Sequence, residues 1–277
     1  MMFLVTGSTG NVGAEVVRAL AAAGANVRAL TRDPATADAQ PGVEYVAGDL
    51  NLPESVEPAL DGVRGLFLLP GYAGLPALLA SARRAGLDRV VLLSGGSAGS
   101  GDPSNAISRY MAESERAVRE SGLPWTFLRP SAFMSNTLQW TGQLKAGDVV
   151  TAPFAGVRIA SVDPYDVAAV AARALLADGH DGRVYQPTGP EALLAEDRLR
   201  ILGGVLGREL HLRAQPDDEA RAEMLKTTPV QYVDAFFDFY VKGTLDESVV
   251  RSTVQDVTGA QPHTFHQWAV AHAEAFR

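Results

Sequence analysis

The sequence contains no cysteine, which excludes disulfide bonds and thiol chemistry and fits a cytoplasmic location. No apolar run reaches about 18 residues, so we expect no membrane-spanning segment. An apolar strand that begins at Phe3 leaves no room for a signal peptide. The net charge of −8 argues against nucleic acid and anionic membrane surfaces as partners. The chain has 277 residues, of which 47% are hydrophobic, and this composition is typical of a soluble α/β protein.

Histidine is scarce and comes late in the chain. The five histidines are His180, His211, His263, His266 and His272. None stands at a ligand-like spacing from other donors, and cysteine is missing. We therefore predict no metal site and assign the histidines to surface or packing positions.

A glycine-rich turn follows directly on the first apolar strand. Residues 3–13 read Phe-Leu-Val-Thr-Gly-Ser-Thr-Gly-Asn-Val-Gly, and a helical pattern comes next. Gly7 permits a tight turn, Gly10 leaves room for a pyrophosphate, and Gly13 lets the helix lie close to the strand. The N–H groups of the helix start, at Asn11 and Val12, attract phosphate. The stretch predicts a dinucleotide site, and the alternative is a purely structural turn.

The N-terminal half alternates strands and helices. The predicted strands are short apolar runs, as expected of a parallel sheet covered on both faces: Phe3–Thr6, Asn26–Leu30, Val43–Ala47, Leu66–Leu69, Arg89–Ser94 and Trp125–Leu128. Helical patterns lie between them, at 12–23, 53–60, 74–86 and 107–121. With right-handed crossovers, these elements predict an α/β fold with a Rossmann-type doubly wound parallel sheet.

The alternation of strands and helices ends after residue 129. Residues 130–134 are loop-like, Val157–Val162 has the pattern of a strand, and Asp163 and Pro164 open a helix that runs through Leu176. Further helices are expected near 192–206, 216–226, 229–241 and 262–276. We predict an NAD(P)-binding domain over 1–130 and a smaller, mostly helical substrate-binding lobe over 131–277, interwoven with the first.

Several segments together resemble the NmrA-like family of atypical short-chain dehydrogenase/reductases, within it the NAD(P)H-dependent quinone oxidoreductases and triphenylmethane reductases. The matching segments, in chain order, are Thr6–Gly13, Val27–Pro34, Gly48–Leu50, Ser121–Asn136, Asp163–Ala168, Thr188–Pro190 and Thr264–Trp268. The resemblance implies NADP(H) or NAD(H) on the glycine-rich turn. Some members reduce quinones, dyes or aromatic polyketides, and others bind the nucleotide without catalysis.

Arg32 follows the second strand, where such folds read the adenosine ribose. An arginine there accommodates the 2′-phosphate of NADP, so we favour NADP(H) over NAD(H); the alternative is an exposed charge. Asp33, beside it, reads as part of a turn with Pro34. In the family, residues matching Asp49 and Leu50 lie against the adenine. The full set of predicted cofactor-binding residues is Thr6, Gly7, Thr9, Gly10, Asn11, Val12, Gly13, Arg32, Asp49, Leu50, Leu69, Pro70 and Ser94.

The acid–base pair of most short-chain dehydrogenases is missing. They use Tyr-x-x-x-Lys, in which lysine lowers the tyrosine pKa. Tyr110 lies in the right region, but Ser114 is its fourth following residue, and no lysine precedes Lys145. Tyr110 and Ser94 are therefore weak catalytic candidates: Tyr110 reads better as a buried structural residue, and Ser94 has no base near it in sequence. Flat apolar walls for an aromatic substrate are expected from Phe133, Met134, Trp140 and Phe154, with ordinary core as the alternative.

Three functional hypotheses remain. The first is an NAD(P)H-dependent oxidoreductase that passes hydride to a quinone-like or other conjugated aromatic acceptor without a Tyr-Lys dyad. The second is a non-catalytic NADP(H)-sensing regulatory protein. The third, a nucleotide-sugar epimerase, is weakened by the missing pair. The expected partners are a small aromatic or quinone-like substrate, no nucleic acid and no membrane, and a homodimer is left open.

Overall fold

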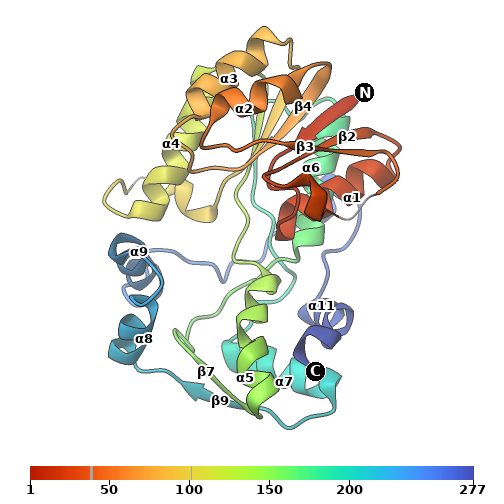
Figure 1. The fold of residues 1–277 in the computed structure, drawn as a ribbon. Coiled ribbons are helices and arrows are strands. Elements are labelled where there is room, and N and C mark those ends of the chain that lie inside the picture. The colour runs from red at the N-terminus through yellow and green to blue at the C-terminus, as the bar shows by residue number, and fades with distance from the viewer. Residues whose placement is uncertain (38–39, 101) are drawn as a thin grey trace.

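The computed structural model describes residues 1–37, 40–100 and 102–277 (Figure 1). Its centre is a seven-stranded sheet in the order β3-β2-β1-β4-β5-β6-β8, with every neighbouring pair parallel. The strands are β1 (Met2–Val5), β2 (Asn26–Thr31), β3 (Val43–Ala47), β4 (Val63–Leu68), β5 (Arg89–Leu93), β6 (Trp125–Leu128) and β8 (Arg183–Tyr185). The predicted Rossmann-type doubly wound sheet is confirmed.

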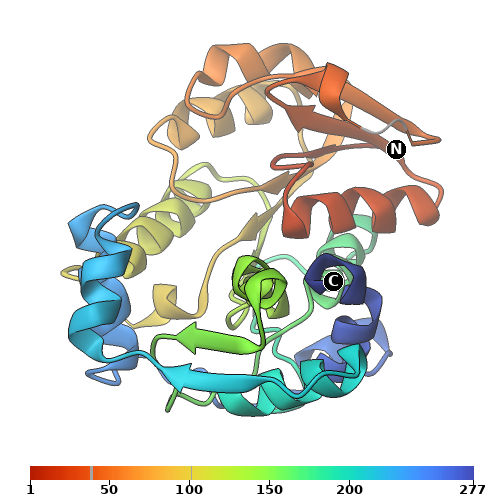
Figure 2. The same cartoon turned by 60° about the horizontal axis from the view of Figure 1, so that its bottom comes forward.

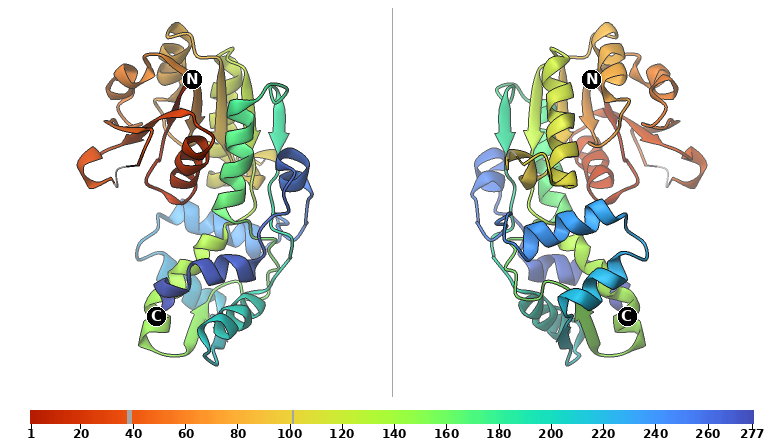
Figure 3. Two further views of the ribbon diagram at one scale, coloured as in Figure 1. Left: turned by 90° about the vertical axis from the view of Figure 1, so that its right-hand side faces the viewer. Right: turned by 90° about the vertical axis from the view of Figure 1, so that its left-hand side faces the viewer.

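Helices cover both faces of this sheet. One face carries α1 (Asn11–Ala22) and α6 (Pro164–Leu176), which lie against each other (Figure 3). The other carries α3 (Leu75–Arg84), α4 (Ala106–Glu120) and the short α2 (Pro53–Val56). Alternate residues of the central strand feed the two cores: Phe3 and Val5 join the α1/α6 side, and Leu4 joins the α3/α4 side. The continuous apolar runs of the sequence are thus explained by burial on both faces.

The second half of the chain builds a smaller body below the carboxyl ends of the sheet strands (Figures 1 and 2). Its elements are α5 (Thr141–Ala146), β7 (Val149–Ala152), α7 (Ala195–Leu206), β9 (His211–Ala214), α8 (Asp217–Met224), α9 (Val230–Tyr240) and α11 (Phe265–Ala271). Strands β7 and β9 form a separate two-stranded parallel sheet. Trp140, Trp268 and Phe265 are fully buried in the core of this body.

Three elements beyond residue 130 return to the large sheet. Helix α6 packs on α1, α10 (Thr253–Thr258) packs on α6, and β8 pairs with β6. Asp163 caps α6 as expected, because its Oδ1 accepts from the Tyr165 N–H at 3.0 Å and Pro164 takes the first helical position. The division at residue 130 stays a prediction.

Some expected elements were wrong. Val157–Val162 is not a strand: within the described residues it makes only single bridges, Ile159 with Leu193 and Val162 with Phe133. The apolar residues of this segment are packed without a neighbouring strand that pairs along its length, so its apolar pattern wrongly predicted a strand. The expected helix at 262–276 begins at Phe265, since Thr264 and Gln267 form a capping box there. Strands β7, β8 and β9 were missed because each has only three or four residues and none has the buried apolar run that marks the equally short β1 and β6.

In the described part of the chain, none of the helices has both the length and the apolar character needed to cross a membrane.

Candidate active site

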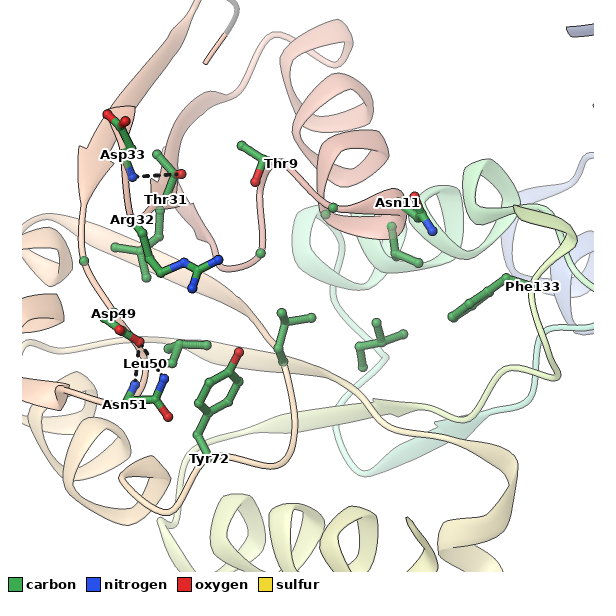
Figure 4. A pocket seen from close by; sticks show the side chains of 18 residues that line it. Thr9, Asn11, Thr31, Arg32, Asp33, Asp49, Leu50, Asn51, Tyr72 and Phe133 are labelled. Atoms are coloured by element: carbon green, nitrogen blue, oxygen red, sulfur yellow. Dashed lines mark hydrogen bonds between the residues drawn. The ribbon is translucent and has the colours of Figure 1, made fainter. Parts of the chain in front are cut away.

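A cleft of about 990 Å³ opens at the carboxyl ends of the first strands, where the sheet order reverses on either side of β1 (Figure 4). This is the crevice in which doubly wound sheets bind their ligands. We call it the first cavity. It is lined by Gly7, Thr9, Gly10, Asn11, Val12, Gly13, Leu30, Thr31, Arg32, Asp33, Gly48, Asp49, Leu50, Asn51, Leu69, Tyr72, Leu93 and Phe133.

The three glycines of the turn differ in what surrounds them. Gly7 has φ +62°, and a Cβ there would lie 2.4 Å from Leu69 Cδ1. A Cβ on Gly13 would lie 2.1 Å from the Gly7 carbonyl oxygen. A Cβ on Gly10 would meet only that same oxygen, at 3.3 Å, and would otherwise project into open space. Gly7 and Gly13 are therefore required by the backbone, whereas Gly10 keeps the cavity open.

The start of α1 faces this cavity. Gly10 is the N-cap residue and no side chain caps the helix. The first main-chain N–H groups of α1, at Asn11, Val12 and Gly13, lie at the cavity wall, where the helix dipole adds positive potential. This arrangement suits a diphosphate.

Arg32 and Asp49 stand at the other end of the first cavity. Arg32 is exposed, and its guanidinium extends between the Thr9 turn and Asp49 (Figure 4). The Asp49 carboxylate accepts hydrogen bonds from the Asn51 main-chain and side-chain N–H groups, both at 2.9 Å, which with the charge of Arg32 hold the pKa of Asp49 below its ordinary value. Asp33 accepts from the Ala35 N–H at 3.0 Å and caps a short turn.

The first cavity brings together most of the predicted cofactor residues but not all. Thr6 is fully buried and ties β1 to β4, since its hydroxyl donates to the Phe67 carbonyl and accepts from the Leu69 N–H. Pro70 and Ser94 do not line it. Sequence reasoning missed seven lining residues: Leu30, Thr31, Asp33, Gly48, Asn51, Tyr72 and Leu93. Five of these directly adjoin predicted positions in the chain, which was the available signal, whereas Leu30 and Tyr72 do not.

Ser94 belongs to a buried polar network rather than to an open wall. Its hydroxyl donates to Glu115 Oε1 at 2.7 Å, and Arg129 donates to both Glu115 oxygens at 2.8 and 2.7 Å. Glu115 is 1% exposed. Glu115 also forms an ion pair with Arg119, at 3.2 Å. The Ser94 proton is committed to a carboxylate, which leaves it poorly placed to act on a substrate.

Tyr110 is partly buried on α4. Its ring packs edge-on against Tyr232 of α9, with centroids 6.3 Å apart, and lies next to Gly71. Burial, followed by the proximity of Tyr232, raises the pKa of Tyr110 above its ordinary value. A tyrosine in such surroundings is a weaker acid than one beside a lysine.

A second cavity, of about 550 Å³, lies in the smaller body. It is lined by Ala132, Ser135, Asn136, Gln139, Trp140, Ala152, Pro153, Phe154, Val157, Ile159, Ala195, Arg198, Met224, Phe236 and Tyr240. Of the predicted substrate residues, Trp140 and Phe154 line it, Phe133 lines the first cavity, and Met134 is 2% exposed in the core. The aromatic side chains of α9 surround Phe154, whose ring centroid lies 5.2 Å from those of both Phe237 and Tyr240.

One chain segment separates the two cavities. Phe133 faces the first, and the adjoining Ala132, Ser135 and Asn136 face the second. The Asn11 side chain, on the first cavity, donates to Ser135 Oγ at 3.2 Å. The glycine-rich turn and the second cavity are thus joined by a direct hydrogen bond.

Comparison with known proteins agrees with this geometry. A family model described as NAD(P)H-binding matches residues 7–178. A (4-alkanoyl-5-oxo-2,5-dihydrofuran-3-yl)methyl phosphate reductase of Streptomyces griseus is 40% identical over 99% of each chain, and an NAD(P)H azoreductase of Xenophilus azovorans is 35% identical over 99% of each. Among solved structures, an NADPH-dependent quinone oxidoreductase from Escherichia coli, in complex with NADPH, superposes with a TM-score of 0.81 at 23% identity, over 98% of this chain and 99% of that one.

Proposed function

The chain belongs to the NAD(P)H-binding family, as an NmrA-like reductase, and on that premise we propose that it transfers hydride from NADPH to a conjugated, electron-poor acceptor of the quinone type. That it is an NAD(P)H-dependent oxidoreductase follows from full-length similarity to two reductases. The same similarity sets aside the non-catalytic sensor. A cytoplasmic location and a homodimer stay predictions from the sequence.

The observation that supports the cofactor most strongly is the pairing of an uncapped helix start with an open glycine. Gly10 and the first N–H groups of α1 would hold the diphosphate, and Arg32 would hold the 2′-phosphate of NADPH. Asp49 and Leu50 would lie along the adenosine. No carboxylate stands where Arg32 does, which is the feature that favours NADPH over NADH.

The acceptor class is argued from the walls and from the relatives. The named substrate of the Streptomyces reductase is a conjugated lactone that carries a phosphate, and the azoreductase acts on azo compounds, as its name states. Both kinds of molecule are flat and accept hydride at a conjugated system. Phe133, which projects into the first cavity, is the residue we assign to stacking such an acceptor against the nicotinamide (Figure 4).

We further propose that turnover needs no tyrosine–lysine dyad. The bound nicotinamide supplies the hydride. The protein holds the acceptor in position for hydride transfer. Positioning is sufficient for an electron-poor acceptor, because solvent can supply its proton. The raised pKa of Tyr110 and the commitment of the Ser94 hydroxyl to Glu115 both support this assignment.

Steady-state oxidation of NADPH with a panel of quinones and azo dyes tests the proposal. We expect turnover with at least one planar acceptor, and a higher kcat/KM with NADPH than with NADH. A folded protein that binds NADPH but transfers no hydride to any member of the panel would contradict it.

A further inference from the structure

Arg198 is an arginine enclosed by protein without an acidic partner. It lies in the first turns of α7 and lines the second cavity. Across residues 1–37, 40–100 and 102–277, every other arginine that forms no ion pair is exposed, whereas Arg198 is not. Its Nε is sealed from solvent and makes no hydrogen bond with any described residue.

An enclosed cation without a partner is costly. Removing a guanidinium from water is compensated only when hydrogen bonds and opposite charge replace the lost hydration. Burial here lowers the pKa of Arg198 below its ordinary value. Among the residues that the structure describes, the favourable contact found for this cation is the Trp140 ring, whose centroid lies 5.3 Å from the guanidinium carbon. A ring face stabilises the charge but does not replace the hydrogen bonds that the guanidinium N–H groups lost.

The carboxylate behind this cavity wall, Glu247, accepts hydrogen bonds from two other groups. Glu247 accepts from the Tyr240 hydroxyl at 2.8 Å and from the Ala132 N–H at 2.7 Å. Tyr240 lines the same cavity as Arg198, so Glu247 lies behind the cavity wall, and burial raises its pKa. No ion pair between Glu247 and Arg198 is present among the described residues, and the positive charge is left facing the cavity.

We propose that Arg198 binds an oxyanion carried by the hydride acceptor, either a phosphate monoester or a carboxylate. The proposal rests on the proposed function, since it names the substituent of the acceptor reduced at the first cavity. A guanidinium offers several N–H donors in a planar fork that matches an oxyanion. The ring of the acceptor would stack on Phe133 in the first cavity, and its anionic arm would extend past Ser135 into the second cavity toward Arg198.

A matched series of acceptors tests this by kinetics. We would use 2-(hydroxymethyl)-1,4-naphthoquinone, its phosphate monoester and the 2-carboxymethyl analogue, with saturating NADPH. The unmodified protein should show a lower KM for one of the anionic arms than for the neutral alcohol. Arg198→Gln should reduce the anionic-to-neutral ratio of kcat/KM by about 10- to 100-fold, the range of a lost charge-assisted contact. Arg198→Lys should recover part of that ratio, because it keeps the charge.

The matched control is Arg200→Gln, two residues along the same helix. The Arg200 side chain is 72% exposed and pairs with Asp197. This variant should leave the anionic-to-neutral ratio unchanged. An unchanged ratio in Arg198→Gln, or an equal loss in both variants, would overturn the proposal. Which of the two anionic arms gains more distinguishes a phosphate site from a carboxylate site.

A binding measurement separates this inference from the proposed function. Calorimetry on the NADP⁺-loaded protein would use compounds that cannot be reduced: 2-naphthylmethyl phosphate, 2-naphthylacetate and 2-naphthylmethanol. Loading with NADP⁺ keeps the phosphate compound out of the first cavity. Anion-dependent binding that Arg198→Gln abolishes supports the site even if no quinone is turned over. Turnover of neutral quinones without any anion-dependent binding supports the function and rejects the site.

Discussion

The two cavities differ in which parts of the chain form their walls. The walls of the first cavity come largely from consecutive strand ends, and the part that we assign to phosphate is main chain and glycine. The second is walled by side chains from five separate stretches between residues 132 and 240, with aromatic rings and one arginine. A site made of main chain tolerates few sequences and therefore reveals itself in a short motif. A site made of side chains on distant elements varies more freely in sequence, so the second cavity is where we expect substrate specificity to be set.

The largest difference in effect is expected between substitutions of two glycines in the same turn, Gly13 and Gly10. Gly13→Val should fail to fold or lose more than about 4 kcal/mol of stability, because its Cβ would lie 2.1 Å from the Gly7 carbonyl oxygen. Gly10→Val should fold normally and lose cofactor binding, because its side chain would fill the phosphate path. Thermal melts with calorimetric titration of NADPH would measure both. Unchanged NADPH affinity in folded Gly10→Val would remove the phosphates from this turn.

The polar network beside the first cavity should give the next largest effect. Glu115→Ala leaves Arg129 buried without its partner, so we expect a loss of about 3–5 kcal/mol in the free energy of unfolding. Ser94→Ala removes one of the donors to the Glu115 carboxylate but leaves the ion pair with Arg129, so it should cost less, about 1.5–3 kcal/mol. Urea unfolding of both variants would measure the difference. Equal losses would mean that the Glu115–Arg129 pair does not dominate this network.

Arg32 tests the adenosine end of the first cavity. Arg32→Ala should weaken NADPH binding by about 1.5–3 kcal/mol and spare NADH, because only NADPH carries the 2′-phosphate. Dissociation constants for both cofactors give the answer. A matched substitution, Arg18→Ala, removes an exposed arginine that pairs with Glu15 away from the cavity and should change neither constant. Equal affinity of the unmodified protein for the two cofactors would contradict the assignment.

Substitutions of Phe133 and Tyr110 test whether the reaction rate depends on positioning of the acceptor or on proton transfer from the protein. Phe133→Ala should lower kcat by roughly tenfold through misplacement of the acceptor. Tyr110→Phe should keep most of the activity, since the Tyr110 pKa is raised and its hydroxyl is a poor acid. Quinone reductase rates of both variants decide. A drop of about 10²–10⁴-fold in Tyr110→Phe would identify Tyr110 as a general acid.

The smallest effect concerns the contact between the sheet helices and the C-terminal segment. Burial raises the pKa of Asp166 to about 6, although its carboxylate accepts from the His263 N–H at 2.7 Å. The folded form then holds this proton at pH values where the unfolded chain, with a pKa near 3.8, has lost it. Stability contributed by Asp166 is therefore complete below pH 4 and declines as the pH rises to about 6.

Asp166→Asn should remove that decline, because asparagine still accepts from the His263 N–H but does not ionise. We expect a difference on the order of 1 kcal/mol between the two pH dependences, which corresponds to a few degrees in Tm. Melting curves at pH 4, 5, 6 and 7 would measure it. Parallel pH profiles for the two proteins would show that Asp166 titrates normally in the folded state.

The sequence by itself determined the sheet and the first cavity. Strands buried on both faces, a helix after each, and glycines at 7, 10 and 13 leave little freedom, because backbone geometry demands those residue types at those places. Arg32 was predicted from its place directly after the second strand, and Asp49 and Leu50 from the family resemblance; all three line the first cavity.

Only the tertiary structure decided the rest. Arg198 and Tyr240 belong to helices about forty residues apart, and nothing local signals that both face one cavity. Glu115 stands among charged residues on α4, and only the packing of the fold buries it with Ser94 and Arg129. Burial and partnership of charged side chains depend on which segments fold against them. They are properties of the three-dimensional packing, and no short stretch of sequence encodes them.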